Sequence, residues 1–155
     1  MSRIASLLRA LAIGAAVVTG ADAAVAGEVH EVRMLNRNDI GPMPYEPDYL
    51  AIAPGDTIRF VPTTKGHNAE TIKGFVPEGA QPFRSKLSET FEITLTEPGF
   101  YGIKCTPHYA MGMVMLVQVR DEAGARRASD VTLPQGLPPR ARKRFEEIID
   151  RAAGK

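Results

Sequence analysis

The chain has 155 residues, and its 19 lysines and arginines nearly balance its 18 aspartates and glutamates, which gives a formal net charge of +1. Proteins that bind nucleic acid through its phosphates need an excess of basic residues, so the composition argues against that class of function. Cys105 is the single cysteine, which excludes an intrachain disulfide.

Residues 1–26 have the pattern of a secretory signal peptide. Arg3 and Arg9 precede an apolar run, L-A-I-G-A-A-V-V-T-G, and A-V-A at positions 24–26 fits the small-residue rule for cleavage. The run is shorter than the roughly 20 apolar residues of a membrane-spanning helix, which argues against an anchor. We therefore expect export to the periplasm, with cleavage before Gly27, or alternatively after Ala23, and one mature domain of residues 27–155.

Short apolar segments separated by turn signals follow this leader. Residues 90–96 alternate clearly, with Phe91, Ile93 and Leu95 on one face, and Ile58 and Phe60 share a face in the segment 57–62. Short strands at intervals of about ten residues are typical of an all-β sandwich rather than of a βαβ fold. The expected strands are 28–35, 49–53, 57–62, 90–96, 100–105 and 113–119.

The last third of the chain differs in pattern from the strands. Phe145, Ile148 and Ile149 have the i, i+3, i+4 spacing of an amphipathic helix, after a break at P-Q-G-L-P-P. We expect one or two short helices within residues 121–153 that cover one side of the sandwich. The basic run Arg140 to Arg144 then forms a solvated helix face.

The stretch K-C-T-P-H-Y-A-M-G-M, residues 104–113, gathers unusual chemistry. It contains Cys105, then His108 after two residues and Met113 after four more, while His67 lies in an expected loop upstream. One thiolate, two imidazoles and a weak thioether form the donor set of a blue-copper electron-transfer site, because soft sulfur favours Cu(I) and imidazole also suits Cu(II). Met111 is a rival axial ligand, but we place it beside the site as an apolar surface contact.

Other interpretations of these residues remain open. Cys105 could be the nucleophile of an enzyme with a histidine as its base, but that leaves Met113 and the second histidine without a role. A periplasmic copper-binding or copper-delivery protein would use a similar set of donors. A multicopper oxidase is excluded because three histidines cannot build its further copper centres. We therefore expect a carrier and no enzymatic turnover.

The sequence resembles the cupredoxins, a family of blue-copper proteins, from about residue 28 to the C-terminal helices. The similarity rests on M-L-N (34–36), P-G-D-T (54–57), K-G-H-N (65–68), I-K (72–73), V-P-E-G-A (76–80) and the stretch 104–113. It implies a Greek-key sandwich of about eight strands with two C-terminal helices and one copper ion bound by His67, Cys105, His108 and Met113. The segment 41–47, G-P-M-P-Y-E-P, contains more proline than the family leads us to expect.

Two neighbours of the ligands are expected to tune the copper. Asn68 can offer its backbone N–H to the Cys105 sulfur and connect the two ligand loops through its side-chain amide, whereas Pro107 has no N–H to offer. Cations close in sequence would surround an electron port at His108 and attract an acidic partner to a monomeric carrier. The resemblance implies that such partners are nitrite or nitrous-oxide reductases and c-type cytochromes. The expected docking residues are Lys65, Lys73, Arg84, Lys86, Lys104 and Met111, with Arg37 a further candidate.

Overall fold

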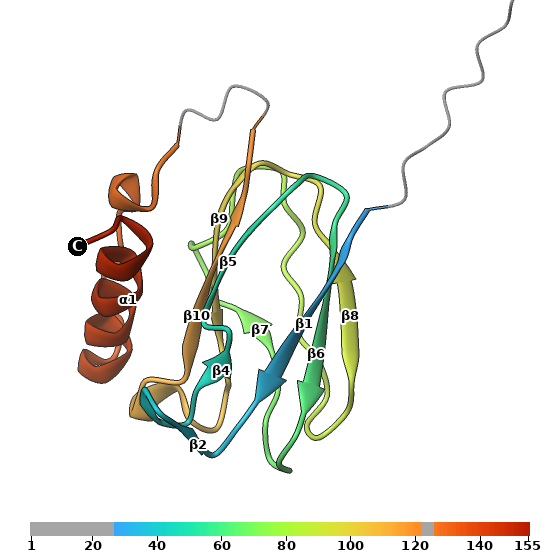
Figure 1. Ribbon diagram of the computed structural model, residues 1–155, viewed down its shortest axis with the longest axis vertical. Helices are drawn as coiled ribbons and strands as arrows, with labels where there is room; N and C mark the ends of the chain where they lie inside the picture. Colours follow the sequence, from blue (N-terminus) through green and yellow to red (C-terminus); the bar gives the residue numbers. More distant parts are fainter. Residues whose placement is uncertain (1–26, 122–125) are drawn as a thin grey trace, which may run out of the picture.

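The structure, a computed structural model, describes residues 27–121 and 126–155. Two four-stranded sheets pack face to face, and one α-helix covers the outer surface of one sheet (Figure 1). The all-β sandwich predicted from the sequence is therefore confirmed. The predicted signal peptide lies outside the described residues. No helix in the described ranges is both long enough and apolar enough to cross a membrane.

The first sheet has the strand order β4-β1-β6-β8. Strand β1 runs parallel to β6, while the β1–β4 and β6–β8 pairs are antiparallel. Ile58 and Phe60 of β6 are fully buried and Arg59 between them is exposed, so the alternation predicted for this segment is confirmed. The strands are β1 (Val29–Met34), β4 (Tyr45–Glu46), β6 (Thr57–Pro62) and β8 (Phe91–Thr94).

The second sheet has the order β5-β10-β9-β7, with β5 parallel to β10 and the other pairs antiparallel. All six expected strands are present. The two-residue strands were not predicted, because an alternating pattern needs more positions to become visible. The strands of this sheet are β5 (Tyr49–Ile52), β7 (Glu70–Thr71), β9 (Gly99–Lys104) and β10 (Val114–Val119), and a separate pair is formed by β2 (Arg37–Asn38) and β3 (Gly41–Pro42).

Strand β10 is buried along its whole length because it lies between two layers. Met115 and Val117 belong to the core between the sheets, whereas Val114 and Leu116 pack under the helix. A strand with apolar contacts on both faces reads as a continuous hydrophobic run rather than as an alternation. This position explains the sequence M-V-M-L-V directly after the candidate metal loop.

The helix α1 (Pro139–Ala152) buries Phe145 and Ile148 against this face of the sheet. At its C-terminal end Arg151 donates to both carboxylate oxygens of Asp48, at 2.8 and 2.6 Å, and so connects the helix to the start of β5. Of the two C-terminal helices that the family resemblance implies, the described residues contain one, α1; the other segment forms only a three-residue 3₁₀ turn, η2 (Ala128–Asp130). The closely spaced prolines in L-P-Q-G-L-P-P, residues 133–139, separate this turn from α1.

Candidate metal centre

The loop between β9 and β10 presents three of the four candidate ligands. Cys105 directly follows β9 and Met113 directly precedes β10, and these strands are antiparallel neighbours. The Cys105 N–H donates to the Met113 carbonyl at 3.0 Å, which holds the two ends of the loop together. Within the loop, the Met113 N–H donates to the His108 carbonyl at 3.2 Å. This bond spans the short turn η1 (Tyr109–Met111), which lies between the two residues. The loop is thus a tight hairpin that fixes its own donors.

His67 comes from a different part of the chain, the loop between β6 and β7. Its carbonyl accepts a hydrogen bond from the Ser88 N–H at 2.9 Å, and the Ser88 hydroxyl oxygen accepts one from the Gly66 N–H at 2.8 Å. The loop is therefore held on both sides of the histidine by the segment that precedes β8.

Three donor atoms from the two loops form a compact triangle. Cys105 Sγ lies 3.7 Å from His67 Nδ1 and 3.5 Å from His108 Nδ1, and the two nitrogens are 3.2 Å apart. A metal about 2.0 Å from each nitrogen and about 2.3 Å from sulfur would separate trigonal donors by roughly 3.5–3.8 Å. The spacing suits a His₂Cys trigonal metal site.

The far nitrogen of His67 sets the orientation of its ring. Nε2 lies 2.9 Å from Asn36 Oδ1 and 3.0 Å from Thr64 Oγ1. Because an amide oxygen can only accept, Nε2 carries the proton, which leaves Nδ1 unprotonated and directed at the cysteine sulfur. Sequence reasoning missed Asn36 and Thr64 in this role, although Asn36 belongs to the M-L-N segment that carries the family resemblance.

Burial separates the two methionines and the two histidines. Met113, His67 and Cys105 are fully buried, whereas 39% of Met111 is exposed. This favours Met113 over Met111 as the fourth donor. His108 is half-buried, so it lies nearer to the surface than His67, as its loop position indicates.

The buried setting also affects the protonation of the donors. Burial lowers the pKa of His67, and the nearby His108 lowers it further, so His67 is neutral as a metal ligand must be. Burial raises the pKa of the Cys105 thiol, against the opposing effect of backbone N–H bonds from Asn68 and His108. Without a metal the thiol is protonated at neutral pH, which does not suit an activated nucleophile.

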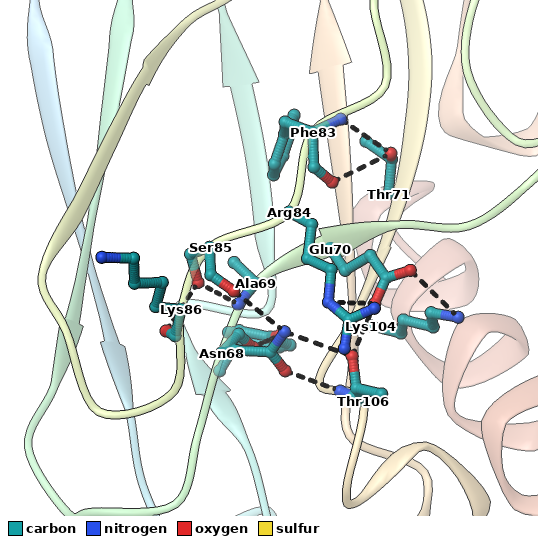
Figure 2. Close-up of polar contacts among 11 residues, drawn as sticks. Asn68, Ala69, Glu70, Thr71, Phe83, Arg84, Ser85, Lys86, Lys104 and Thr106 are labelled. Carbon is teal, nitrogen blue, oxygen red and sulfur yellow. Dashed lines mark hydrogen bonds and ion pairs between the residues drawn. The ribbon is translucent and has the colours of Figure 1, made fainter.

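Asn68 connects the two ligand loops as the sequence suggested. Its Oδ1 accepts the Thr106 N–H at 2.8 Å and its Nδ2 donates to the Thr106 hydroxyl at 3.2 Å (Figure 2). Its backbone N–H donates to the Cys105 sulfur, and its carbonyl accepts the Tyr45 hydroxyl at 2.7 Å. Tyr45 is fully buried in the proline-rich segment 41–47, and the sequence alone did not reveal this contact.

Most of the expected docking residues line one of three depressions. Lys73, Arg84 and Lys104 line one depression, and Arg84 and Lys86 line another that includes the exposed Pro107. Met111 instead lies beside cations of helix α1, and Lys65 is exposed in the loop before His67. Arg37, the further candidate, is exposed on β2.

Three of these cations have a carboxylate partner. Lys86 Nζ lies 3.8 Å from Glu89 Oε2, but the Lys86 side chain is still 82% exposed. The other two share Glu70. Lys104 Nζ lies 3.6 Å from Glu70 Oε1 and 5.2 Å from the centre of the Tyr109 ring, and Arg84 Nε lies 3.5 Å from Glu70 Oε2. With the side chain of Lys104 only 22% exposed, Lys73 and Lys86 are the more accessible charges.

Comparison with known proteins assigns the family. The model of the copper-binding proteins of the plastocyanin/azurin family matches residues 32–120. The chain belongs to this family. It is 46% identical over 136 residues to the pseudoazurin of Paracoccus pantotrophus, an alignment that covers 88% of this chain and 92% of the relative.

Solved structures agree with this assignment. The crystal structure of pseudoazurin from Methylobacterium extorquens AM1 superposes with a TM-score of 0.63 at 40% identity, over 78% of this chain and 99% of that one. Pseudoazurin from Hyphomicrobium denitrificans gives a TM-score of 0.62 at 34% identity, over 77% of this chain and 97% of that one. The cupredoxin fold and the copper cofactor expected from the sequence are confirmed, and the protein is a blue-copper electron carrier.

Proposed function

We propose that the protein is a periplasmic carrier that receives and delivers single electrons by brief contact with acidic redox proteins, using His67, Cys105, His108 and Met113 as copper ligands. The observation that carries this proposal is the triangle of His67 Nδ1, Cys105 Sγ and His108 Nδ1, with sides of 3.2–3.7 Å. Copper held there would supply the Cu(I)/Cu(II) couple.

The residues around the donors serve to keep the site rigid. Both histidines present Nδ1, and the orientation of His67 is fixed by Asn36 and Thr64. The two ligand loops are joined by Asn68. A site whose donors are already in place changes little in geometry when an electron arrives, and this lowers the reorganisation that slows electron transfer. Met113, fully buried at the base of the loop, would be the weak axial donor.

Electrons would enter and leave at His108, because it is the one of the four candidate ligands that is not fully buried. Pro107 and Met111 beside it are exposed and offer a small apolar contact. Lys86 lines the same depression as Pro107, and Lys73 is a further exposed lysine. Their positive charge would speed the approach of an acidic partner and orient it. Nitrite or nitrous-oxide reductases and c-type cytochromes are the partners we propose, with the carrier acting as a monomer and catalysing no turnover of its own.

The docking proposal is tested by the rate of electron transfer to a c-type cytochrome at several ionic strengths. We expect the second-order rate constant to fall with added salt and to fall in Lys86→Gln at low salt. Lys155→Gln is the matched control, because its exposed lysine lies at the C-terminal end of the chain. A rate constant that does not change with ionic strength, or an equal effect of the two substitutions, contradicts docking through Lys86.

A further inference from the structure

Glu70 has contacts that its place on the short edge strand β7 does not require. Thr106 donates its hydroxyl proton to Glu70 Oε2 at 2.6 Å, and Arg84 and Lys104 approach the same carboxylate at 3.5 and 3.6 Å (Figure 2). The Glu70 side chain is 21% exposed and that of Lys104 is 22% exposed. This carboxylate is thus held from three sides next to the residue that follows Cys105.

The direction of the Thr106 hydrogen bond matters because a hydroxyl has only one proton to donate. With that proton directed at Glu70, the hydroxyl oxygen is left to accept the Asn68 Nδ2–H at 3.2 Å. Asn68 Oδ1 at the same time accepts the Thr106 backbone N–H at 2.8 Å. The two bonds run in opposite directions between the same two residues, so together they fix the orientation of the Asn68 amide.

The hydrogen bonds connect Glu70 to both ligand loops. Thr106 directly follows Cys105, and Asn68 directly follows His67. Successive hydrogen bonds polarise and align one another, so a change at the carboxylate affects how Thr106 and Asn68 hold the two loops together. Glu70 is therefore two hydrogen bonds away from Asn68, by way of the Thr106 hydroxyl.

We propose that Glu70 is a positioning residue for the redox centre: by orienting the Thr106 hydroxyl, it fixes the Asn68 connection between the two ligand loops and so influences the reduction potential. This inference rests on the proposed copper ligands. In this account Arg84 and Lys104 hold Glu70 in place through their ion pairs. Part of their positive charge is therefore neutralised within the protein.

A double-mutant cycle tests this role, because a through-space charge effect also shifts a potential. Glu70→Gln and Thr106→Val are made singly and together, and the reduction potential of each copper-loaded protein is measured by voltammetry. If Glu70 acts through Thr106, its substitution shifts the potential in the parent and by less than half as much in the Thr106→Val background. Equal shifts in the two backgrounds, or no shift in either, overturn the proposal.

Two further variants separate position from charge. Glu70→Asp keeps the negative charge but withdraws the carboxylate by one methylene, so we expect it to shift the potential as well; a parent-like potential would contradict a positioning role. Glu92→Gln removes a carboxylate paired with Arg59 at 2.5 Å on the other sheet and leaves the Thr106 contacts intact. Its potential should match the parent, and a shift as large as that of Glu70→Gln would indicate a general effect of charge.

The copper-free protein gives a readout that does not depend on the proposed ligands. In Glu70→Gln the side-chain amide resonances of Asn68 should move in the proton–nitrogen NMR spectrum, while those of Asn38, which donates to Glu46 at 2.9 Å, should stay in place. Unchanged Asn68 resonances overturn the role of Glu70. If the parent fails to bind copper while these resonances do move, the proposed copper site fails and the connection through Thr106 stands.

Discussion

Replacing Asn68 with alanine should destabilise the copper-free protein more than most polar substitutions do. The side chain makes three hydrogen bonds: it accepts from the Thr106 N–H at 2.8 Å and donates to the Thr106 hydroxyl at 3.2 Å and to the Ser85 carbonyl at 3.4 Å. Asn68 is 1% exposed, so water cannot replace these partners in the folded state. At about 1 kcal/mol for each good bond and less for the longest, the expected loss is about 2–3 kcal/mol in the free energy of unfolding.

Urea denaturation of the copper-free protein measures this loss. Asn38→Ala is the matched control, since Asn38 makes two side-chain hydrogen bonds, to Glu46 and from the Ile40 N–H, but is only half-buried. We expect its cost to stay below about 1 kcal/mol, because water can partly replace the lost partners at this position. If Asn68→Ala unfolds at the same urea concentration as Asn38→Ala, the two ligand loops are not held together by this side chain and the reasoning is refuted.

Three further predictions concern the thiolate, acid stability and the helix. Pro107→Ala should raise the reduction potential by roughly 40 mV, the equivalent of about 1 kcal/mol for one electron, because it adds a donor near the thiolate; an unchanged or lower value in voltammetry contradicts this. Burial raises the pKa of Asp56, but hydrogen bonds from His30 and two backbone N–H groups outweigh it and hold the pKa below its ordinary value. The resulting stability is present above about pH 4 and is lost as pH falls through the folded-state pKa, so the melting temperatures of Asp56→Asn and the parent should differ at neutral pH and converge towards pH 2; a constant difference argues against it. Arg151→Ala removes the guanidinium nitrogen that bonds both oxygens of the buried Asp48 carboxylate and should cost about 1–3 kcal/mol by urea denaturation, and an unchanged midpoint would show that this ion pair does not hold the helix.

The sequence predicts the longer strands and the metal loop well because both leave a local pattern. Alternation identifies β6 and β8, and the spacing of Cys105, His108 and Met113 within one hairpin carries the chemistry of the site. His67 is harder to predict, since only the fold brings its loop to the same end of the sandwich. The chain has only three histidines, so few residues compete with His67 for the role of second imidazole ligand.

Contacts between distant segments could not be predicted in this way. Asn36, Tyr45 and Glu70 approach the ligand loops through pairings that no local pattern encodes. His30 on β1 likewise lies 2.9 Å from the Asp56 carboxylate, with its side chain only 20% exposed. Lys104, one of the expected docking residues, is paired with Glu70. These differences share one cause: a charge or polar group that looks solvated in sequence is paired by a segment from another strand.

The most direct test of the copper site is the visible spectrum of the mature protein with Cu(II), before and after ascorbate. We expect an intense blue or green absorption from the bond between copper and the Cys105 thiolate, which bleaches on reduction, returns on oxidation and is absent in Cys105→Ser. A colourless protein whose cysteine is readily alkylated in the presence of copper would contradict the proposed site and favour a nucleophilic cysteine.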